Sequence, residues 1–324
     1  MMELFGSTFD DSMFVETRDR ESVALDSYNA KVCEPQWFCA DAALEANDCL
    51  EKQKVMKFRG DLAVRKGEHQ KAFDAYSACL EWVSDNNLNI RRDVLEGMAR
   101  CCIKMGQKDK ALEYVDLLNK EASNTCHLTS LLLLKVSIYH HYGDVQAKMS
   151  CLQHLCSLLP FNPWHWLDLG HACLQLLRSA NTTVEPSKGH GSEMVKLQSS
   201  EEAADLNEDT VWLKACSCFI RSRLLLRILQ QQQSSFVLKR SGKALEETDQ
   251  ALQQLEPTET TIQRLTEVMS EDLIPDKMRE DYQDGESLAI VCIQSFRERW
   301  WDRILNSGMI QDKPHSKDKS DTNI

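Results

Sequence analysis

Residues Pro160 to Gly170 read PFNPWHWLDLG, and this stretch decides the fold. Asn162 suits the cap of a helix N-terminus, and Pro163 suits the first helical position, where its missing N–H is no loss. Pro160 stands in the position that closes the preceding element, because proline cannot continue a helix. The stretch therefore predicts the end of one helical hairpin and the start of another, whose first helix runs to about Leu177.

Three residues of this stretch, Trp166, Leu169 and Gly170, have the W-x2-L-G spacing of a tetratricopeptide (TPR) repeat. Such repeats stack helical hairpins into a surface that holds another protein, and they perform no chemistry of their own. The spacing therefore predicts a protein-binding function, without indicating the partner.

Three further hairpins are expected before this stretch. Their turns contain Gly67, Gly106 and Gly143, which are spaced a little more widely than the about 34 residues of a strict TPR repeat. Ala72 and Tyr76 of the first hairpin follow the A-x3-[FY] pattern of a TPR second helix, whose aromatic side chain fills the space between helices. The third hairpin departs from the pattern and depends on its glycine, Leu152 and Pro160.

Ala215 and Phe219 repeat the A-x3-F spacing after a segment rich in Ser, Thr, Gly and Glu. We expect the helix that carries them to complete the fourth hairpin, separated from its partner by an inserted loop. Such an insertion is tolerated because loop-closure entropy grows slowly with length.

The fold class predicted is all-α, a TPR-like α-solenoid of three to four helical hairpins with a C-terminal helical cap. Capping helices are expected near residues 235–255, 259–270 and 284–306. The predicted regions are an extended N-terminal arm (1–50) pinned through Trp37 and Phe38, repeats (51–178), a flexible inserted loop (179–209), completing and capping helices (210–307) and a disordered tail (308–324).

The composition is that of a globular helical protein. Hydrophobic residues make up 42% and charged residues 27%, while Gly and Pro, which long helices tolerate poorly, number only 12 and 7. The net charge of −12, from 38 basic and 50 acidic residues, argues against general binding to nucleic acid or anionic membranes. No apolar run approaches the roughly 20 residues of a membrane span.

The 13 cysteines lie within apolar helical patterns, and the start MMELFG lacks the basic and apolar regions of a secretory signal. We therefore expect a reducing compartment, cytoplasmic and/or nuclear, with the cysteines as small buried hydrophobic residues.

Several blocks resemble one family across nearly the whole chain. They begin at Cys33 (CEPQWF), Phe58 (FRGDLA), Pro160 (PFNPW), Lys214 (KACSCFIRSRLLL) and Glu267 (EVMSED). This set resembles the uncharacterised vertebrate family named after chromosome eight open reading frame seventy-six. The resemblance implies a TPR-like helical fold in an intracellular vertebrate protein, and it implies no activity, cofactor or site residue.

One cluster has metal-ligand chemistry, with members Cys151, His154, Cys156, His165, His171 and Cys173. Structural zinc needs four convergent ligands, but Cys156 points away from Cys151 on a straight helix. We therefore expect no metal. No nucleophile elbow, P-loop or dinucleotide fingerprint is present, so we expect neither catalysis nor a cofactor.

Basic residues recur after position 220, at Arg221, Arg223, Arg227, Lys239, Arg240 and Lys243. A solvated amphipathic face explains them, although an acidic peptide or nucleic acid is an alternative ligand. The adjacent Trp300 and Trp301 are expected to pack into the core, with one of them as a docking residue in the alternative.

The first helix of each TPR hairpin lines a concave groove. The predicted groove residues are Lys54, Lys57, Asp61, Arg65, Asp93, Glu96, Arg100, Lys104, Ser130, Leu133, Ser137, His140, Trp164, Leu167 and His171. Trp164 is expected to face the groove and Trp166 to pack between units. Mixed charges of this kind also occur on faces that serve only solubility.

Some TPR proteins hold a chaperone's C-terminal carboxylate with Lys and Asn. Here Lys57 matches, but Asp61 replaces the Asn and Asp93 lies on the following helix, so we expect no binding of that kind. The function predicted is a non-enzymatic adaptor for an unidentified protein partner. The alternatives are a subunit of an obligate intracellular complex and a nuclear factor that binds nucleic acid through residues 221–243.

Overall fold

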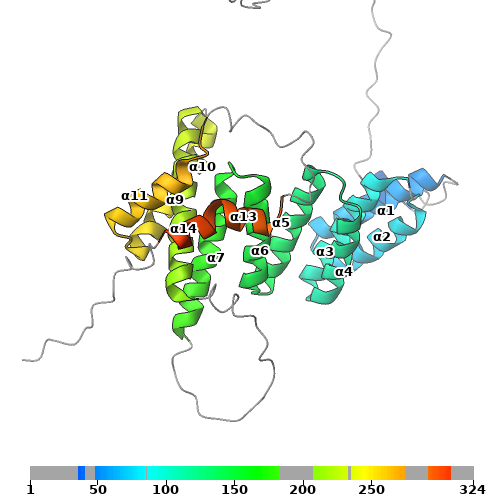
Figure 1. Cartoon of the computed structure of the whole chain (residues 1–324). Helices are drawn as coiled ribbons and strands as arrows, with labels where there is room; N and C mark the ends of the chain where they lie inside the picture. Colours follow the sequence, from blue (N-terminus) through cyan, green and yellow to red (C-terminus); the bar gives the residue numbers. More distant parts are fainter. Residues whose placement is uncertain are drawn as a thin grey trace, which may run out of the picture.

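A computed structural model describes residues 36–40, 48–84, 86–182, 207–232, 235–274 and 291–307. The described residues form helices and turns and contain no β-strand (Figure 1). The helices are α1 (Cys49–Arg65), α2 (His69–Trp82), α3 (Leu88–Lys104), α4 (Lys108–Lys120), α5 (Thr125–His141), α6 (Val145–Leu158), α7 (Pro163–Thr182), α9 (Glu208–Gln232), α10 (Ser235–Leu255) and α11 (Glu259–Ser270). The all-α prediction is confirmed for these residues.

Residues 291–307, which we call the C-terminal segment, contain α13 (Ile293–Phe296), a π-helical turn (Arg297–Trp301) and α14 (Asp302–Asn306). Each helix from α1 to α7 packs against the next along the chain, and α7 packs against α9. The C-terminal segment breaks this order, because it runs back so that α13 contacts α6 and α14 contacts α11 (Figure 1).

The turns between the paired helices are set by glycine. Gly67, Gly106 and Gly143 have φ of 76°, 73° and 71°, a left-handed conformation that residues with a Cβ adopt at a cost. In each turn the next N–H bonds back to a carbonyl inside the helix, as in Glu68 N–H to Ala63 O at 2.9 Å. The three turns that the sequence predicted are therefore confirmed.

The start of α7 also agrees with the sequence. The Asn162 side chain accepts the backbone N–H of Trp164 at 3.0 Å, and Pro163 is the first helical residue. Asn124 and Asp144 cap α5 and α6 in the same manner. These caps satisfy N–H groups that have no partner within the helix.

Aromatic side chains of the second helices fill space left by glycines of the first helices. A Cβ placed on Gly60 of α1 would lie 2.5 Å from the Tyr76 ring, and one on Gly97 of α3 would lie 2.8 Å from it. Gly170 of α7 meets Phe219 of α9 in the same way, at 2.9 Å. The packing of α7 against α9 confirms that the helix carrying Phe219 completes the fourth hairpin.

The buried residues form three clusters. Two small clusters lie within α1–α5 and centre on Tyr76 and on Leu95. One large cluster joins α5, α6, α7, α9, α10 and α11 with the C-terminal segment, and Trp166 and Phe219 lie within it. The core is thus local in the first half of the molecule and assembled from distant segments in the second.

The described part of the N-terminal arm lies on α1. The Phe38 and Phe58 rings are 5.6 Å apart, and Arg59 donates to the carbonyls of Phe38 at 2.7 Å and Ala40 at 3.1 Å. This contact confirms that Trp37 and Phe38 pin the arm. The rest of the predicted arm, most of the inserted loop and the predicted tail lie outside the described residues.

Candidate functional site

Two cavities follow one another along the face between α3 and α5. The first has a volume of about 280 Å³. Its lining residues are Asn89, Arg92, Asp93, Glu96, Leu118, His127, Ser130, Leu131 and Leu134. Ser130 has a small side chain and therefore fills little of this cavity. Leu131 and Leu134, which are almost fully buried, form its apolar floor. This arrangement leaves room for side chains of another molecule beside a mixed polar rim.

The second cavity lies nearer the C-terminal ends of the same helices and has a volume of about 540 Å³. Its lining residues are Val64, His69, Arg100, Cys101, Ile103, Lys104, Ser137, His140 and His141. Between the cavities, on the exposed face of α5, Leu133 is 43% exposed. We call the two cavities and Leu133 the α3–α5 groove.

The structure brings together the groove residues that the sequence predicted on these two helices. Asp93, Glu96 and Ser130 line the first cavity, and Arg100, Lys104, Ser137 and His140 line the second. His127 and His141 line the same face of α5 but were not among the predicted residues; His127 extends the face by one turn before Ser130, and His141 follows the predicted His140. Continuing the i, i+3, i+4 spacing from Ser130 and Ser137 would have found both.

The predicted groove residues on α1 are already engaged within the chain. Lys57 Nζ lies 3.1 Å from Asp61 Oδ2 and 3.9 Å from Asp93 Oδ2, and Tyr76 Oη donates to Asp61 Oδ1 at 2.8 Å. Burial and this hydrogen bond raise the pKa of Tyr76, so the phenol stays protonated. Lys54 pairs with Glu51 at 2.7 Å. The cation of Lys57 therefore faces two carboxylates before any ligand arrives.

Arg65, the last predicted residue on α1, lies at a different cavity. That cavity has a volume of about 370 Å³ and is lined by Arg65 and Asp61 together with Phe38 of the N-terminal arm. Arg65 does not line either cavity of the α3–α5 groove.

The fourth predicted set does not extend the groove. Leu167 is only 6% exposed and belongs to the large core cluster, so its assignment to an open groove is wrong. His171 Nε2 lies 2.9 Å from Glu247 of α10, and the guanidinium of Arg240 of α10 stacks 4.4 Å over the Trp164 ring. Helix α10 therefore occupies the place that a ligand would take beside α7.

The predicted basic stripe after position 220 is solvated only in part. Arg221 is 0% exposed, and the half-buried Arg223 lies 3.7 Å from Asp249. Arg227, Lys239 and Arg240 are exposed, but Arg240 covers Trp164. The expectation of a solvated face is wrong for Arg221, whose guanidinium has buried partners from distant segments, and it is confirmed for Arg227, Lys239 and Lys243.

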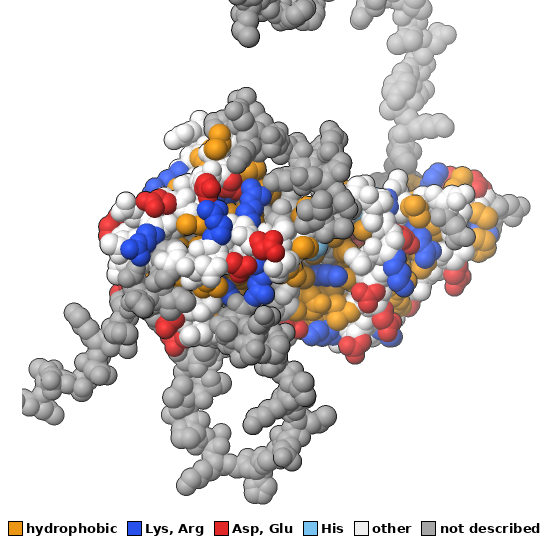
Figure 2. Space-filling view, viewed as in Figure 1, with side chains coloured by type: hydrophobic (Ala, Val, Ile, Leu, Met, Phe, Trp, Pro, Cys, Tyr) orange, Lys and Arg blue, Asp and Glu red, His pale blue; other side chains and the backbone are white. Residues whose placement is uncertain are grey.

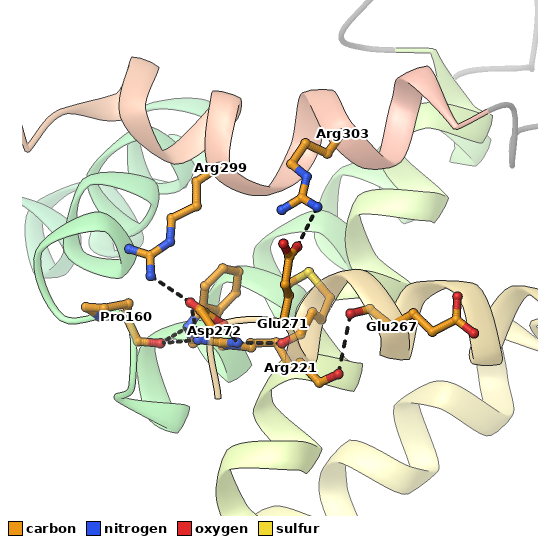
Figure 3. Close-up of polar contacts among 10 residues, drawn as sticks. Pro160, Arg221, Glu267, Glu271, Asp272, Arg299 and Arg303 are labelled. Carbon is orange, nitrogen blue, oxygen red and sulfur yellow. Dashed lines mark hydrogen bonds and ion pairs between the residues drawn. The ribbon is translucent and has the colours of Figure 1, made fainter. Parts of the chain in front are cut away.

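Arg221 and its buried partners form a network of hydrogen bonds and ion pairs, which we call the buried hub. The guanidinium of Arg221 donates to the carbonyls of Pro160 and Met269 and to both carboxylate oxygens of Asp272. Arg299 of the C-terminal segment donates to the same carboxylate at 2.7 Å, so two arginines converge on Asp272 (Figure 3). Since Asp272 follows α11, the hub connects that helix with α9 and with the C-terminal segment.

Aromatic rings close over this hub. Trp166 Nε1 donates to the Pro160 carbonyl at 2.9 Å, and its ring lies 5.0 Å from Trp300 and 5.4 Å from Phe296. The guanidinium of Arg221 lies 5.7 Å from the Trp166 ring, where a cation is attracted to the ring face. The expected role of Trp166 in packing is confirmed.

Trp300 and Trp301 are both 2% exposed. They lie within the π-helical turn, which changes the angle between neighbouring side chains from that of an α-helix. The expectation that both tryptophans pack is therefore confirmed.

The candidate zinc residues are dispersed in the core. Burial lowers the pKa of His165 to about 4 and raises the pKa of Cys151 to about 11, so neither charged form is favoured at neutral pH. Within the described ranges no group of three or more His, Cys, Asp and Glu is placed to hold a metal ion. No helix of the described residues is long and apolar enough to cross a membrane.

Known proteins match the chain over most of its length. The model of a family of unknown function (DUF5588) matches residues 3–192 and 175–307. Uncharacterized protein C8orf76 of Homo sapiens is 33% identical over 358 residues, covering 93% of each chain. Its Rattus norvegicus homolog is 32% identical over 321 residues, covering 86% of this chain and 85% of that protein. The resemblance inferred from the sequence blocks is confirmed.

Proposed function

The chain belongs to this family of unknown function, and we propose that it acts as a non-enzymatic adaptor that binds a segment of another protein in the α3–α5 groove. The observation that carries the proposal is the pair of cavities, about 280 and 540 Å³, that follow one another along α3 and α5. Their length along the helices suits an extended peptide or a helix better than a compact small molecule.

We propose that the helices form a TPR-like array. Support comes from the order of contacts, in which each helix from α1 to α7 packs on its neighbour in sequence. The positive-φ turn glycines and the fit of Tyr76 against Gly60 and Gly97 also agree with such an array. In this arrangement α3 and α5 are the first helices of successive hairpins, which are the helices that line a TPR groove.

The character of α5 supports an occupied groove. The polar side chains of Ser130 and Ser137, which line the two cavities, are small, and Leu133 is 43% exposed on the same helix. The small side chains allow another molecule to approach α5 closely. Leu133 would act as the apolar anchor, since a few buried anchors carry most of the affinity in protein interfaces.

Filling the groove without changing its charge tests the proposal. The variant Ser130→Tyr with Ser137→Tyr places a ring in each cavity, and Ser179→Tyr with Ser307→Tyr adds the same rings at exposed positions outside the groove. Proximity labelling in cells, followed by direct binding of the captured proteins, should show at least about tenfold weaker binding to the groove variant only, about 1.4 kcal/mol. Equal binding by both variants would contradict the proposal.

A second candidate, a subunit of an obligate complex, is favoured by exposed apolar side chains at the N-terminal end. Of the nine large hydrophobic residues exposed among the described residues, six lie between Trp37 and Leu88. Apolar surface of this kind is buried in obligate interfaces. Light scattering of the purified chain separates the two candidates, because an adaptor stays monomeric whereas an orphaned subunit self-associates.

A further inference from the structure

The two cavities of the α3–α5 groove differ in charge. The first cavity is lined by two carboxylates, Asp93 and Glu96, facing Arg92 and His127. The second cavity is lined by no carboxylate. Its basic and imidazole side chains are His69, Arg100, Lys104, His140 and His141. An anionic group would therefore find no repelling carboxylate among the residues that line the second cavity.

The cations of the second cavity are available to a ligand. Lys104 is exposed and makes no ion pair with any residue in the described part of the chain. Arg100 directs Nε and one terminal nitrogen to a single oxygen of Glu96, at 2.9 and 2.6 Å, and its side chain is 52% exposed. Its remaining terminal nitrogen can donate to a second carboxylate.

Basic residues at a helix C-terminus can also serve to offset the helix dipole. At the end of α3 the carbonyl groups that would attract a cation already accept hydrogen bonds from the turn. The N–H groups of Gly106 and Gln107 donate to the carbonyls of Ile103 at 3.1 Å and Cys102 at 2.9 Å. The exposed ammonium of Lys104 is thus not required to satisfy those carbonyls.

The walls of the second cavity include apolar surface. Val64 of α1 is 39% exposed, and Ile103, which is largely buried, lines the same cavity. A ligand that carried charge alone would leave this surface in water. A ligand with an aliphatic or aromatic side chain next to its carboxylates would cover the apolar wall and meet the cations together.

We propose that the second cavity binds an acidic segment of a partner protein, in which Asp or Glu residues flank an apolar side chain. The inference deepens the proposed function and rests on it. Carboxylates would pair with Arg100 and Lys104 while the apolar side chain lies against Val64 and Ile103. Because exposed ion pairs are weak and screened by salt, the apolar contact supplies much of the affinity and the charges select the segment.

Selection from random peptides displayed on phage, with the immobilised full chain as target, tests this inference. Enriched peptides should combine Asp or Glu with an aliphatic or aromatic residue. Synthetic copies should bind at least about tenfold more weakly to Arg100→Glu with Lys104→Glu, since repulsion replaces attraction at two positions. Lys110→Glu with Lys120→Glu on α4, at exposed positions that line neither cavity, changes the net charge equally and should retain binding.

The outcomes separate this inference from the proposed function. Enriched peptides that are neutral or basic, or that bind the Arg100 and Lys104 variant unchanged, would overturn the acidic assignment. Failure to enrich any peptide would overturn it as well. If the variant Ser130→Tyr with Ser137→Tyr still loses its cellular partners, the proposed adaptor function stands even when the acidic-segment inference has failed. Loss on the Lys110 and Lys120 variant alone would move the anion site to α4 and also overturn the inference.

Discussion

The N-terminal helices α1–α4 and the C-terminal half from α6 onward are built from the same hairpin pattern but are stabilised differently. In α1–α4 the buried residues form small clusters, and partly exposed charged side chains pair within a helix or with a nearby one, as Lys57 does with Asp61 and Asp93. In the C-terminal half one large cluster joins helices far apart in sequence, with the buried Arg221 at its hub.

The two halves also differ in which helix faces their packing leaves open. Nearest-neighbour packing leaves one face of each added hairpin open, as the α3–α5 groove shows. In the second half α13 packs against α6, and Arg240 and Glu247 of α10 contact Trp164 and His171 of α7. Figure 2 shows acidic and basic side chains mixed over the face that it draws. We infer that the first half presents the binding surface and that the second half supplies much of the stability.

The largest expected effect is that of Arg221→Met. It leaves Asp272 and the carbonyls of Pro160 and Met269 with fewer donors in a buried site, and breaking such a pair costs about 3–5 kcal/mol. Urea unfolding followed by circular dichroism measures the change. Arg227→Met on the same helix, at an exposed position, should cost no more than about 0.5 kcal/mol.

Hydrogen exchange of the Arg221 variant tests the comparison itself. Protection should fall in α6–α11 and in the C-terminal segment and stay nearly unchanged in α1–α4. Equal loss of protection in α1–α4 would show that the two halves unfold as one unit.

Acid should destabilise the C-terminal half through His165. Burial lowers the pKa of His165 from 6.5 to about 4, so between these values the unfolded chain binds a proton that the folded chain does not. Stability therefore falls as the pH falls from 6.5 to 4, by about 2–3 kcal/mol in all, and changes no further from this group below pH 4. Chemical unfolding across this range measures the slope. A His165→Gln variant that kept the full slope would assign the loss to other groups.

Replacing a glycine by alanine should change the stability in opposite directions at a tight contact in the first half and at an open position in the second half. Gly60→Ala brings a Cβ to 2.5 Å from the Tyr76 ring and should cost about 1–3 kcal/mol. Gly242→Ala in α10 meets no atom within 4 Å and should instead stabilise by about 0.5–1 kcal/mol through helix propensity. Thermal unfolding of the pair gives the sign of each change, and a Gly60→Ala variant as stable as the unaltered chain, or more stable, would refute the packing described at Gly60.

The smallest expected effect on stability is that of Arg100→Glu in the groove. Arg100 pairs with Glu96 across one helical turn, in a geometry that contributes less than about 1 kcal/mol on an exposed face. The variant should unfold at nearly the same urea concentration as the unaltered chain while losing acidic ligands. A loss of several kcal/mol would place Arg100 among the structural residues.

Local features of the fold were predictable from the sequence because their causes lie within a few residues. Gly67, Gly106 and Gly143 end helices since they tolerate positive φ, and Asn162 caps α7 through a neighbouring N–H. The burial of Arg221 was not predictable in this way. Its periodicity is that of any amphipathic helix, and its carboxylate partner Asp272 lies two helices later in the chain.

For the groove, the sequence placed the exposed faces of α3 and α5 correctly because a helical face follows from spacing alone. It could not show that Leu167 would be buried in the large core cluster or that Arg240 and Glu247 of α10 would contact Trp164 and His171, since these contacts form only after the chain has folded back.

By itself the sequence determined the all-helical class, the hairpin turns and the face that each early helix turns to its neighbours. Only the tertiary structure decided which charges are buried, which grooves are filled and which face stays open. The physical reason is that helix capping and turn conformation depend on adjacent residues. Burial of a cation such as Arg221 instead requires acceptors that folding brings from distant segments.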